Sequence, residues 1–214
     1  MPQLAEHPRK RWTRQECDSL REKGDLIGRY ELIEGDIIDK MGQNPPHATV
    51  IGLLLNWLCP VFGAPYVRCQ LSIRVATPDD RHNEPEPDYI VTREPTPHYS
   101  DAHPGPDDIL LLVEVSDTTK RFDRVTKASL YARSGIIEYW VVDISSLRLI
   151  VYRNPDQGIY QSIVAYSSHE SVSPLASPEA SVVAKQRPHA PLQYKAVFIL
   201  VVVPVQWSRQ CPRP

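Results

Sequence analysis

The sequence predicts one soluble α/β domain in which helices flank a β-sheet of mixed direction. β-prone runs alternate along the chain with segments of helical period, as they do in α/β sheets. The run Ile109–Val115 is apolar apart from Glu114, which is typical of a strand covered on both faces. A length of 214 residues with 42% hydrophobic content suits a single domain with a substantial core.

The polar N-terminus, residues 1–11, is expected to be frayed. Thr13 and Glu16 have the spacing of a capping box, in which each side chain satisfies a backbone N–H of the first helical turn. This pattern predicts a short helix that begins after Thr13 and ends near Gly24. The folded domain is therefore expected to begin at Trp12.

A β-hairpin and a long helix are predicted next. The apolar runs Tyr30–Ile33 and Ile37–Met41 are separated by the turn-forming residues 34–36, an arrangement typical of a hairpin. Asn44 is followed by two prolines, which favours the start of a helix. Apolar residues then recur at helical spacing as far as Pro60, so one face of this helix should be buried.

Three strands are predicted in the central part of the chain. Residues 67–75 alternate between apolar and more polar side chains, as a half-buried strand does. A second strand, Tyr89–Val91, follows Pro87, and the run Ile109–Val115 is the third. Residues 92–108 carry four prolines and are expected to form a surface loop.

One more helix and two more strands complete the predicted sheet. Asp123 is a suitable N-cap for a helix from about Arg124 to Ser134, and Gly135 is a typical residue just past a helix end. Residues 139–142 and 147–152 are β-prone runs joined by a short connection. The domain is expected to end at about residue 184, because the sequence from Ser171 onward loses any period.

The last segment, residues 185–214, is predicted to be an atypical basic tail that contains prolines. It holds five basic residues and no acid, so the rest of the chain has 19 basic against 26 acidic residues, a balance of −7. The tail is either a basic arm for nucleic acid or a segment without an evolved role. We favour the second reading, because the uncharged run Phe198–Val203 would invite aggregation unless an edge pairing in an oligomer hid it.

Composition excludes some kinds of site and partner. The four cysteines form no C-x-x-C pair and the histidines lack zinc-ligand spacing, so we expect reduced thiols, a cytoplasmic protein and no structural zinc. The longest apolar run, Ala196–Val205, is about half of the ~20 residues that a membrane span needs. No membrane partner is therefore expected.

Two acids and a lysine are the candidate catalytic residues. Asp88 stands at the head of one predicted strand and Glu114 near the end of another, so neighbouring strands can bring both carboxylates together. Carboxylate oxygens are the ligands that Mg²⁺ prefers, and metal-assisted hydrolysis also uses a cation near the attacking water. On the predicted helix, Asp123, Lys127 and Tyr131 share one face, which can deliver an ammonium group to the strand ends.

These residues carry a resemblance to a known family. Pro87-Asp88 and Val113-Glu114-Val115 are similar to the PD-(D/E)XK nuclease pattern. Further motifs follow the same order along residues 12–174: Tyr30-Glu31-Leu32-Ile33-Glu34-Gly35, Glu86-Pro87-Asp88, Leu112-Val113-Glu114-Val115-Ser116, Phe122-Asp123-Arg124, Lys127, Leu130-Tyr131-Ala132 and Glu138-Tyr139-Trp140-Val141-Val142-Asp143. Together they resemble the Uma-two-type family of restriction-endonuclease-like proteins. The pattern's lysine is absent, because Ser116 occupies its position.

The resemblance implies a restriction-endonuclease-like fold with a relocated lysine, Lys127. It implies an endonuclease that uses Mg²⁺ or Mn²⁺ to hydrolyse nucleic acid, with DNA as the expected substrate and a homodimer as the expected assembly. Asp88, Glu114 and the carbonyl of Val115 would bind the metal, and Lys127 would orient the attacking water. Glu34 is implied as a further acid, and His47 as a neighbour of the site, with Asp123 and Tyr131 as accessory residues.

Simpler roles fit the same residues. In these roles Asp88 is an acid of an N-terminal turn, and Glu114 is a sheet-edge acid paired with arginine. Lys127 forms an exposed ion pair with Asp123, and Glu34 is an ordinary turn residue. His47 would then be a surface histidine, and Tyr131 a core residue. Two other functional classes stay open: an inactive nuclease-fold scaffold that binds or regulates, and an acid/base hydrolase of the glycosidase type, which gives Lys127 no role.

Overall fold

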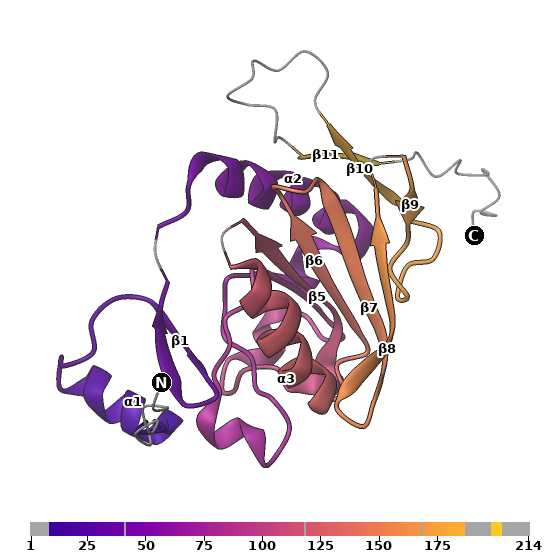
Figure 1. The fold of residues 1–214 in the computed structure, drawn as a ribbon. Coiled ribbons are helices and arrows are strands. Elements are labelled where there is room, and N and C mark those ends of the chain that lie inside the picture. Colours follow the sequence, from indigo (N-terminus) through magenta and orange to yellow (C-terminus); the bar gives the residue numbers. More distant parts are fainter. Residues whose placement is uncertain (1–8, 41, 118, 168, 187–197, 203–214) are drawn as a thin grey trace, which may run out of the picture.

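A six-stranded mixed sheet forms the centre of the computed structural model, which describes residues 9–40, 42–117, 119–167, 169–186 and 198–202 (Figure 1). Its strand order is β3-β4-β5-β6-β7-β8. The strands are β3 (Val67–Cys69), β4 (Tyr89–Thr92), β5 (Ile109–Ser116), β6 (Glu138–Asp143), β7 (Arg148–Asp156) and β8 (Ile159–Tyr166). Only β5 and β6 pair in parallel within this sheet, so the predicted mixed α/β fold is confirmed.

Helices cover both faces of this sheet. The covering helices are α2 (Pro45–Phe62) and α3 (Ala128–Arg133), and a π-helix (Phe122–Lys127) runs directly into α3, whereas α1 (Arg14–Glu22) packs against the hairpin of residues 30–39. The helix α2 packs on one face, where the Trp57 and Trp140 rings stack with centroids 5.8 Å apart. On the other face, Leu130 and Tyr131 of α3 pack with Tyr139 of β6. Figure 1 shows α2 and α3 on opposite sides of the strands.

The strand β5 is buried on both faces, as its apolar run predicted. Leu111, Val113 and Val115 belong to the core under α2, whereas Leu112 belongs to the core under α3. Because side chains alternate along a strand, Glu114 points to the same face as Leu112. That face carries the π-helix and α3, so the strand pleat directs the Glu114 carboxylate toward them.

By length and composition alone, α2 is the one helix among the described residues that passes as a membrane span. Its residues Val50, Leu54, Trp57 and Leu58 are nevertheless buried against the sheet. One face of the helix is therefore buried, as the spacing of its apolar residues predicted. Asn44 caps the helix by accepting a hydrogen bond from the His47 N–H, and the helix continues past Pro60, two residues beyond its expected end.

The predicted hairpin and the first capping box are confirmed. β1 (Tyr30–Ile33) pairs with β2 (Asp36–Asp39), and Glu34 takes a left-handed φ of 54° in the turn between them. All four residues of β1 are buried. The hairpin packs against α1 on one side, and on the other side the backbone of Leu32 forms hydrogen bonds with the backbone of Glu84. Thr13 and Glu16 satisfy each other's backbone N–H groups at the start of α1.

Two sheet strands differ from the sequence prediction. The strand expected over residues 67–75 ends at Cys69, because Gln70 takes a positive φ of 52° and turns the chain out of the pairing register. Ile73 and Val75 stay buried without joining the sheet. The edge strand β8 was not predicted, since its exposed apolar residues do not alternate with buried ones.

A second, three-stranded sheet lies at the C-terminal end. It has the order β11-β10-β9, with β9 (Ser171–Val172), β10 (Val182–Gln186) and β11 (Phe198–Val202). β10 crosses the domain end expected at residue 184, and Val182 belongs to the core under α2. The β-prone run at 198–202 pairs with β10 of its own chain. The frayed N-terminus and most of the basic tail were predicted on residues that lie outside the described ones, namely 1–8, 187–197 and 203–214.

Within the described part of the chain, the connections carry four single 3₁₀ turns. They are Ala64–Tyr66, Asp79–His82, Thr96–Tyr99 and Pro106–Asp108. The last two lie in the proline-rich loop 92–108 that the sequence predicted.

Candidate active site

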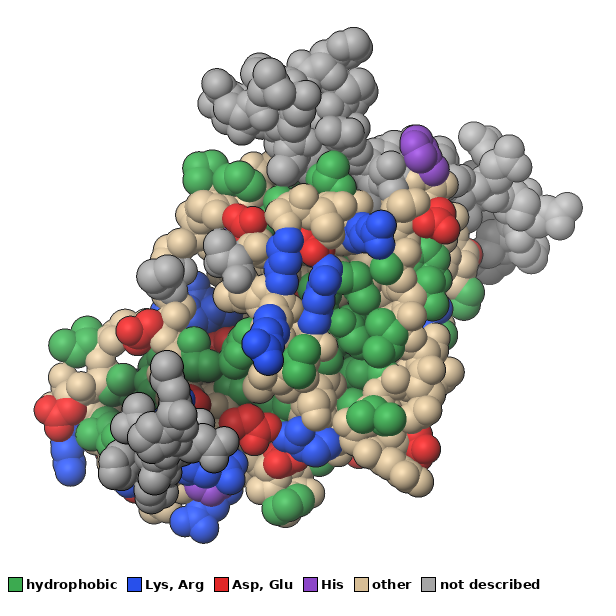
Figure 2. All heavy atoms as spheres, in the orientation of Figure 1, with side chains coloured by type: hydrophobic (Ala, Val, Ile, Leu, Met, Phe, Trp, Pro, Cys, Tyr) green, Lys and Arg blue, Asp and Glu red, His purple; other side chains and the backbone are tan. Residues whose placement is uncertain are grey.

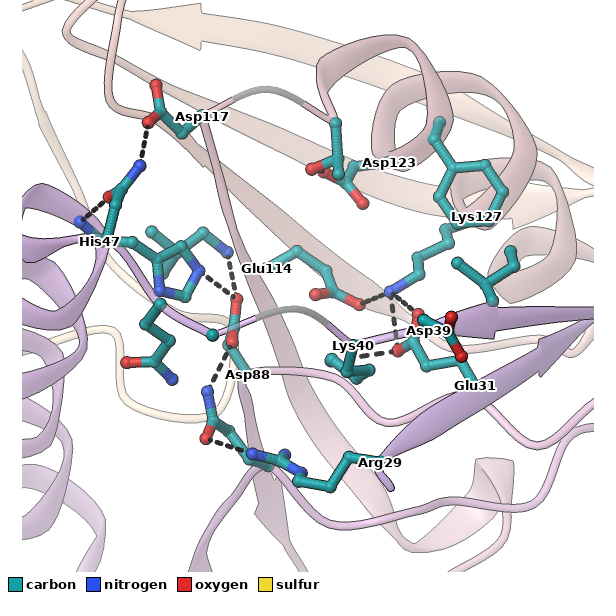
Figure 3. Close-up of a pocket in the computed structure, with 18 residues that line it drawn as sticks. Arg29, Glu31, Asp39, Lys40, His47, Asp88, Glu114, Asp117, Asp123 and Lys127 are labelled. Carbon is teal, nitrogen blue, oxygen red and sulfur yellow. Dashed lines mark hydrogen bonds and ion pairs between the residues drawn. The ribbon is translucent and has the colours of Figure 1, made fainter. Parts of the chain in front are cut away.

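A cavity of about 420 Å³ opens between the β1–β2 hairpin, the start of α2 and the π-helix (Figure 3). Ten of its lining residues are ionisable: Glu31, Asp39, Asp88, Glu114, Asp117, Asp123, Arg29, Lys40, Lys127 and His47. Six of these side chains are carboxylates and three are Lys or Arg. The cavity therefore holds an excess of acid.

Lys127 is the buried cation of this cavity, with 3% of the residue exposed. Its Nζ donates hydrogen bonds to Glu114 Oε1 at 2.8 Å and to Glu31 Oε1 at 2.9 Å. Burial alone would lower the pKa of Lys127, but the Glu114 and Glu31 carboxylates outweigh it and raise that pKa above its usual value. Lys127 consequently remains an ammonium ion at neutral pH.

Glu114 occupies the centre of the cluster, where Figure 3 shows its carboxylate directed at Lys127. The Tyr131 hydroxyl donates a hydrogen bond to Glu114 Oε1 at 3.1 Å. Tyr131 itself does not line the cavity. Burial raises the pKa of Glu114 to about 8; Lys127 opposes this shift, and the charge of Glu31 adds to it. With a pKa of about 8, Glu114 is largely protonated at neutral pH, and a further cation beside it would favour its ionised form.

Asp88 lies on the other side of Glu114, where both of its oxygens accept hydrogen bonds. Oδ2 accepts from the Val115 N–H at 2.8 Å, and Oδ1 accepts from Gln70 Nε2 at 3.1 Å. His47 Nε2 lies 3.4 Å from Oδ2. Although burial would raise it, these contacts with His47 and Val115 hold the pKa of Asp88 below its usual value. Asp88 is therefore ionised at neutral pH.

The π-helix positions Asp123 and Lys127 on its inner side. Asp123 is not the N-cap that the sequence predicted: its backbone N–H bonds to the Thr119 carbonyl, and the chain is helical from Lys120. Its carboxylate accepts from Thr119 Oγ1 at 2.5 Å, and burial raises the pKa of Asp123. Single π-turns occur often at functional sites, and this one keeps both Asp123 and Lys127 buried.

The hairpin contributes a different acid from the one implied by resemblance. Glu34 does not line the cavity; it sits in the hairpin turn and pairs with Arg133 and Arg11. Glu31 reaches the cavity from the strand before that turn. It bridges Lys127, Lys40 and the Glu86 N–H, with its Oε1 accepting the last at 2.9 Å. The acid of the hairpin that joins Asp88, Glu114 and Lys127 is thus Glu31.

The two hairpin acids form a matched pair for mutagenesis. In Glu31→Gln we expect the hydrolytic activity that the resemblance implies to fall at least ~100-fold, because the amide cannot balance the charge of Lys127. In Glu34→Gln we expect activity within about twofold of wild type, because an exposed ion pair contributes little. Initial cleavage rates of the two purified variants check this prediction. Equal losses in both variants would contradict the assignment of Glu31.

The donor set suits a hard divalent cation that keeps much of its water. Among the described residues, no three His, Cys, Asp or Glu side chains are close enough to form a complete metal site. Mg²⁺ needs no such cage, because it is commonly held by one or two carboxylates and several waters. Asp88 and Glu114 can supply two such carboxylates, and Val115 lines the same cavity.

The chain is similar to a family model in sequence and to a solved structure in fold. The family model Uma2, described as "Putative restriction endonuclease", matches residues 20–188. A crystal structure of a nuclease from Anabaena variabilis ATCC 29413, described as putative and as belonging to DUF820, has a similar fold with a TM-score of 0.52. The two chains are 17% identical, and the similarity covers 74% of this chain and 90% of that one. No curated protein matches the chain.

Proposed function

The chain belongs to the Uma2 restriction-endonuclease family, and from that premise we propose that it is a metal-dependent hydrolase of nucleic-acid phosphodiesters with DNA as its substrate. One observation carries the proposal. The carboxylates of Glu31, Asp88, Glu114 and Asp123 are all buried beside a single buried ammonium group, Lys127. Burying unbalanced charge is costly, so an acid excess of this kind favours a site that takes up a cation.

Asp88 and Glu114 are the residues proposed to hold Mg²⁺ or Mn²⁺, together with the carbonyl of Val115. A divalent ion bound there would lower the pKa of a coordinated water and polarise the phosphoryl oxygens. The chain itself fixes the two carboxylates. Asp88 is held by Val115 and Gln70, and Glu114 by Lys127 and Tyr131. Such fixed ligands suit the precise geometry that catalysis requires.

Lys127 is proposed to orient the attacking water and to offset negative charge as it develops on the phosphoryl group. Its raised pKa makes it a hydrogen-bond donor rather than a general base. Glu31 and Glu114 fix the ammonium group at the cavity wall. Glu31 therefore acts as a positioning residue for Lys127, and it takes the place of Glu34, which the family resemblance implied as a further acid of the site.

Wild-type protein tests this proposal directly. We expect labelled DNA to be cut with Mg²⁺ or Mn²⁺ and to stay intact with EDTA. We also expect calorimetry to detect saturable Mn²⁺ binding in the absence of nucleic acid. An RNA of the same sequence shows whether the sugar matters. Protein that binds no Mn²⁺ and cuts neither polymer would instead be a nuclease-fold scaffold that binds or regulates.

A further inference from the structure

A group of four cations lies on the outer side of the segment that forms one wall of the cavity. Thr119, Phe122 and Asp123 of this segment line the cavity. The cations are Lys120, Arg121 and Arg124 of the same segment and Arg148 at the start of β7, and we call them the basic strip. Figure 2 shows Lys and Arg side chains gathered on the face that carries this part of the chain.

Asp143, a buried acid at the end of β6, forms ion pairs with two cations of the basic strip. Lys120 Nζ lies 3.2 Å from Asp143 Oδ1, Arg124 pairs with Oδ2, and Arg148 is the cross-strand partner of Asp143. Burial alone would raise the pKa of Asp143, but hydrogen bonds from Ser146 and contact with Lys120 hold it below its usual value. One buried anion thus holds several cations at one place.

The charge of the strip exceeds what this anchor neutralises. Four positive charges face the negative charge of Asp143 and that of Glu170, which lies near Arg148, while the Lys120 and Arg124 side chains remain 34% and 35% exposed. Arg121 and Arg148 are exposed and enter no salt bridge with a described residue. A surplus of exposed cations at one place attracts a polyanion.

We propose that the basic strip binds the phosphates of nucleic acid that flank the phosphodiester in the cavity, an inference that rests on the proposed function. The acids of the cavity repel a phosphate chain, so its approach needs a surface of opposite sign. The strip supplies that surface on the same helical segment that carries Lys127. It also implies a polymeric substrate, because a mononucleotide in the cavity would leave the strip without a ligand.

The salt dependence of binding tests this inference in EDTA, where no cleavage occurs. Each phosphate contact adds about −0.9 to the slope of log K against log salt for a duplex and about −0.7 for a single strand. In the double variant Arg121→Gln/Arg148→Gln we therefore expect a slope shallower by about 1.4 to 1.8. We also expect affinity to fall at least about tenfold at low salt. Fluorescence anisotropy with short labelled single-stranded DNA, duplex DNA and RNA measures both quantities.

The matched control is Lys23→Gln/Arg81→Gln, which removes two exposed cations from α1 and the 79–82 turn. Both double variants should melt within a few degrees of wild type, since exposed substitutions change stability little. The inference is overturned if the strip variant keeps the wild-type slope, or if the control loses as much affinity. The two proposals can also fail separately. If only the strip variant loses binding, and the wild-type protein never cuts DNA, then the basic strip still binds nucleic acid but the nuclease proposal is wrong.

Discussion

Lys127→Ala is expected to lose nuclease activity and much of its stability. Removing the ammonium leaves Glu31 and Glu114 buried without their shared partner, and breaking a buried ion pair in this way costs about 3–5 kcal/mol. The loss of a charge that stabilises the transition state lowers the rate at least ~10²-fold. Denaturant unfolding and initial cleavage rates measure the two effects separately.

The pH dependence and one further variant separate the loss of charge from the loss of packing. In Lys127→Met the side chain keeps most of its volume, so a similar drop in stability identifies charge as the cause. The stability of both variants should recover as the pH falls, because protonated carboxyl groups cost less to bury than carboxylates. Burial already raises the pKa of Glu114 to about 8 with Lys127 present. Undiminished cleavage by Lys127→Ala would refute the proposed role of Lys127.

The core of the candidate site could be predicted from the sequence because its signals are local. Glu114 is the charged residue in an apolar run, and its strand is indeed buried on both faces. Asp123, Lys127 and Tyr131 were expected on one helix face, and all three are buried there. The structure brings Asp88, Glu114 and Lys127 to the same cavity.

Glu31 could not be found in this way, because its position depends on tertiary packing. Both faces of β1 are buried, so no alternation of polar and apolar residues distinguishes Glu31 from its neighbours. The family resemblance instead implied Glu34, which lies at the left-handed position of the hairpin turn. Only the packing of the hairpin beside Lys127 determines which acid enters the cavity.

The missed elements have similar physical reasons. The π-helix adds about one residue to a helical turn, but the segment Phe122–Lys127 contains too few apolar residues to reveal that change in spacing. The edge strand β8 is exposed at Ile159, Ile163 and Val164, so it lacks the period of two that marks a half-buried strand. The short end of β3 depends on one backbone angle, the positive φ of Gln70. Hydrophobic pattern contains little information on any of these features.

Asp88→Ala is expected to remove metal binding while keeping a folded protein. Asp88 is ionised and fixed by Val115 and Gln70, so it offers a divalent cation a charged ligand that needs no reorganisation. Its loss leaves the buried Val115 N–H without an acceptor, which costs about 1–3 kcal/mol. That cost is partly offset, because a buried negative charge is removed as well.

Calorimetry should show Mn²⁺ affinity at least ~10-fold to 100-fold weaker in Asp88→Ala, and cleavage should fall below detection. Asp88→Asn keeps an oxygen for the Val115 N–H, so it should recover stability without recovering metal affinity. The control is Asp39→Asn, which neutralises an exposed acid of the same cavity and should leave Mn²⁺ binding within about twofold of wild type. If all three variants bind Mn²⁺ as wild type does, Asp88 is not a ligand of the ion, and the proposed metal site is refuted.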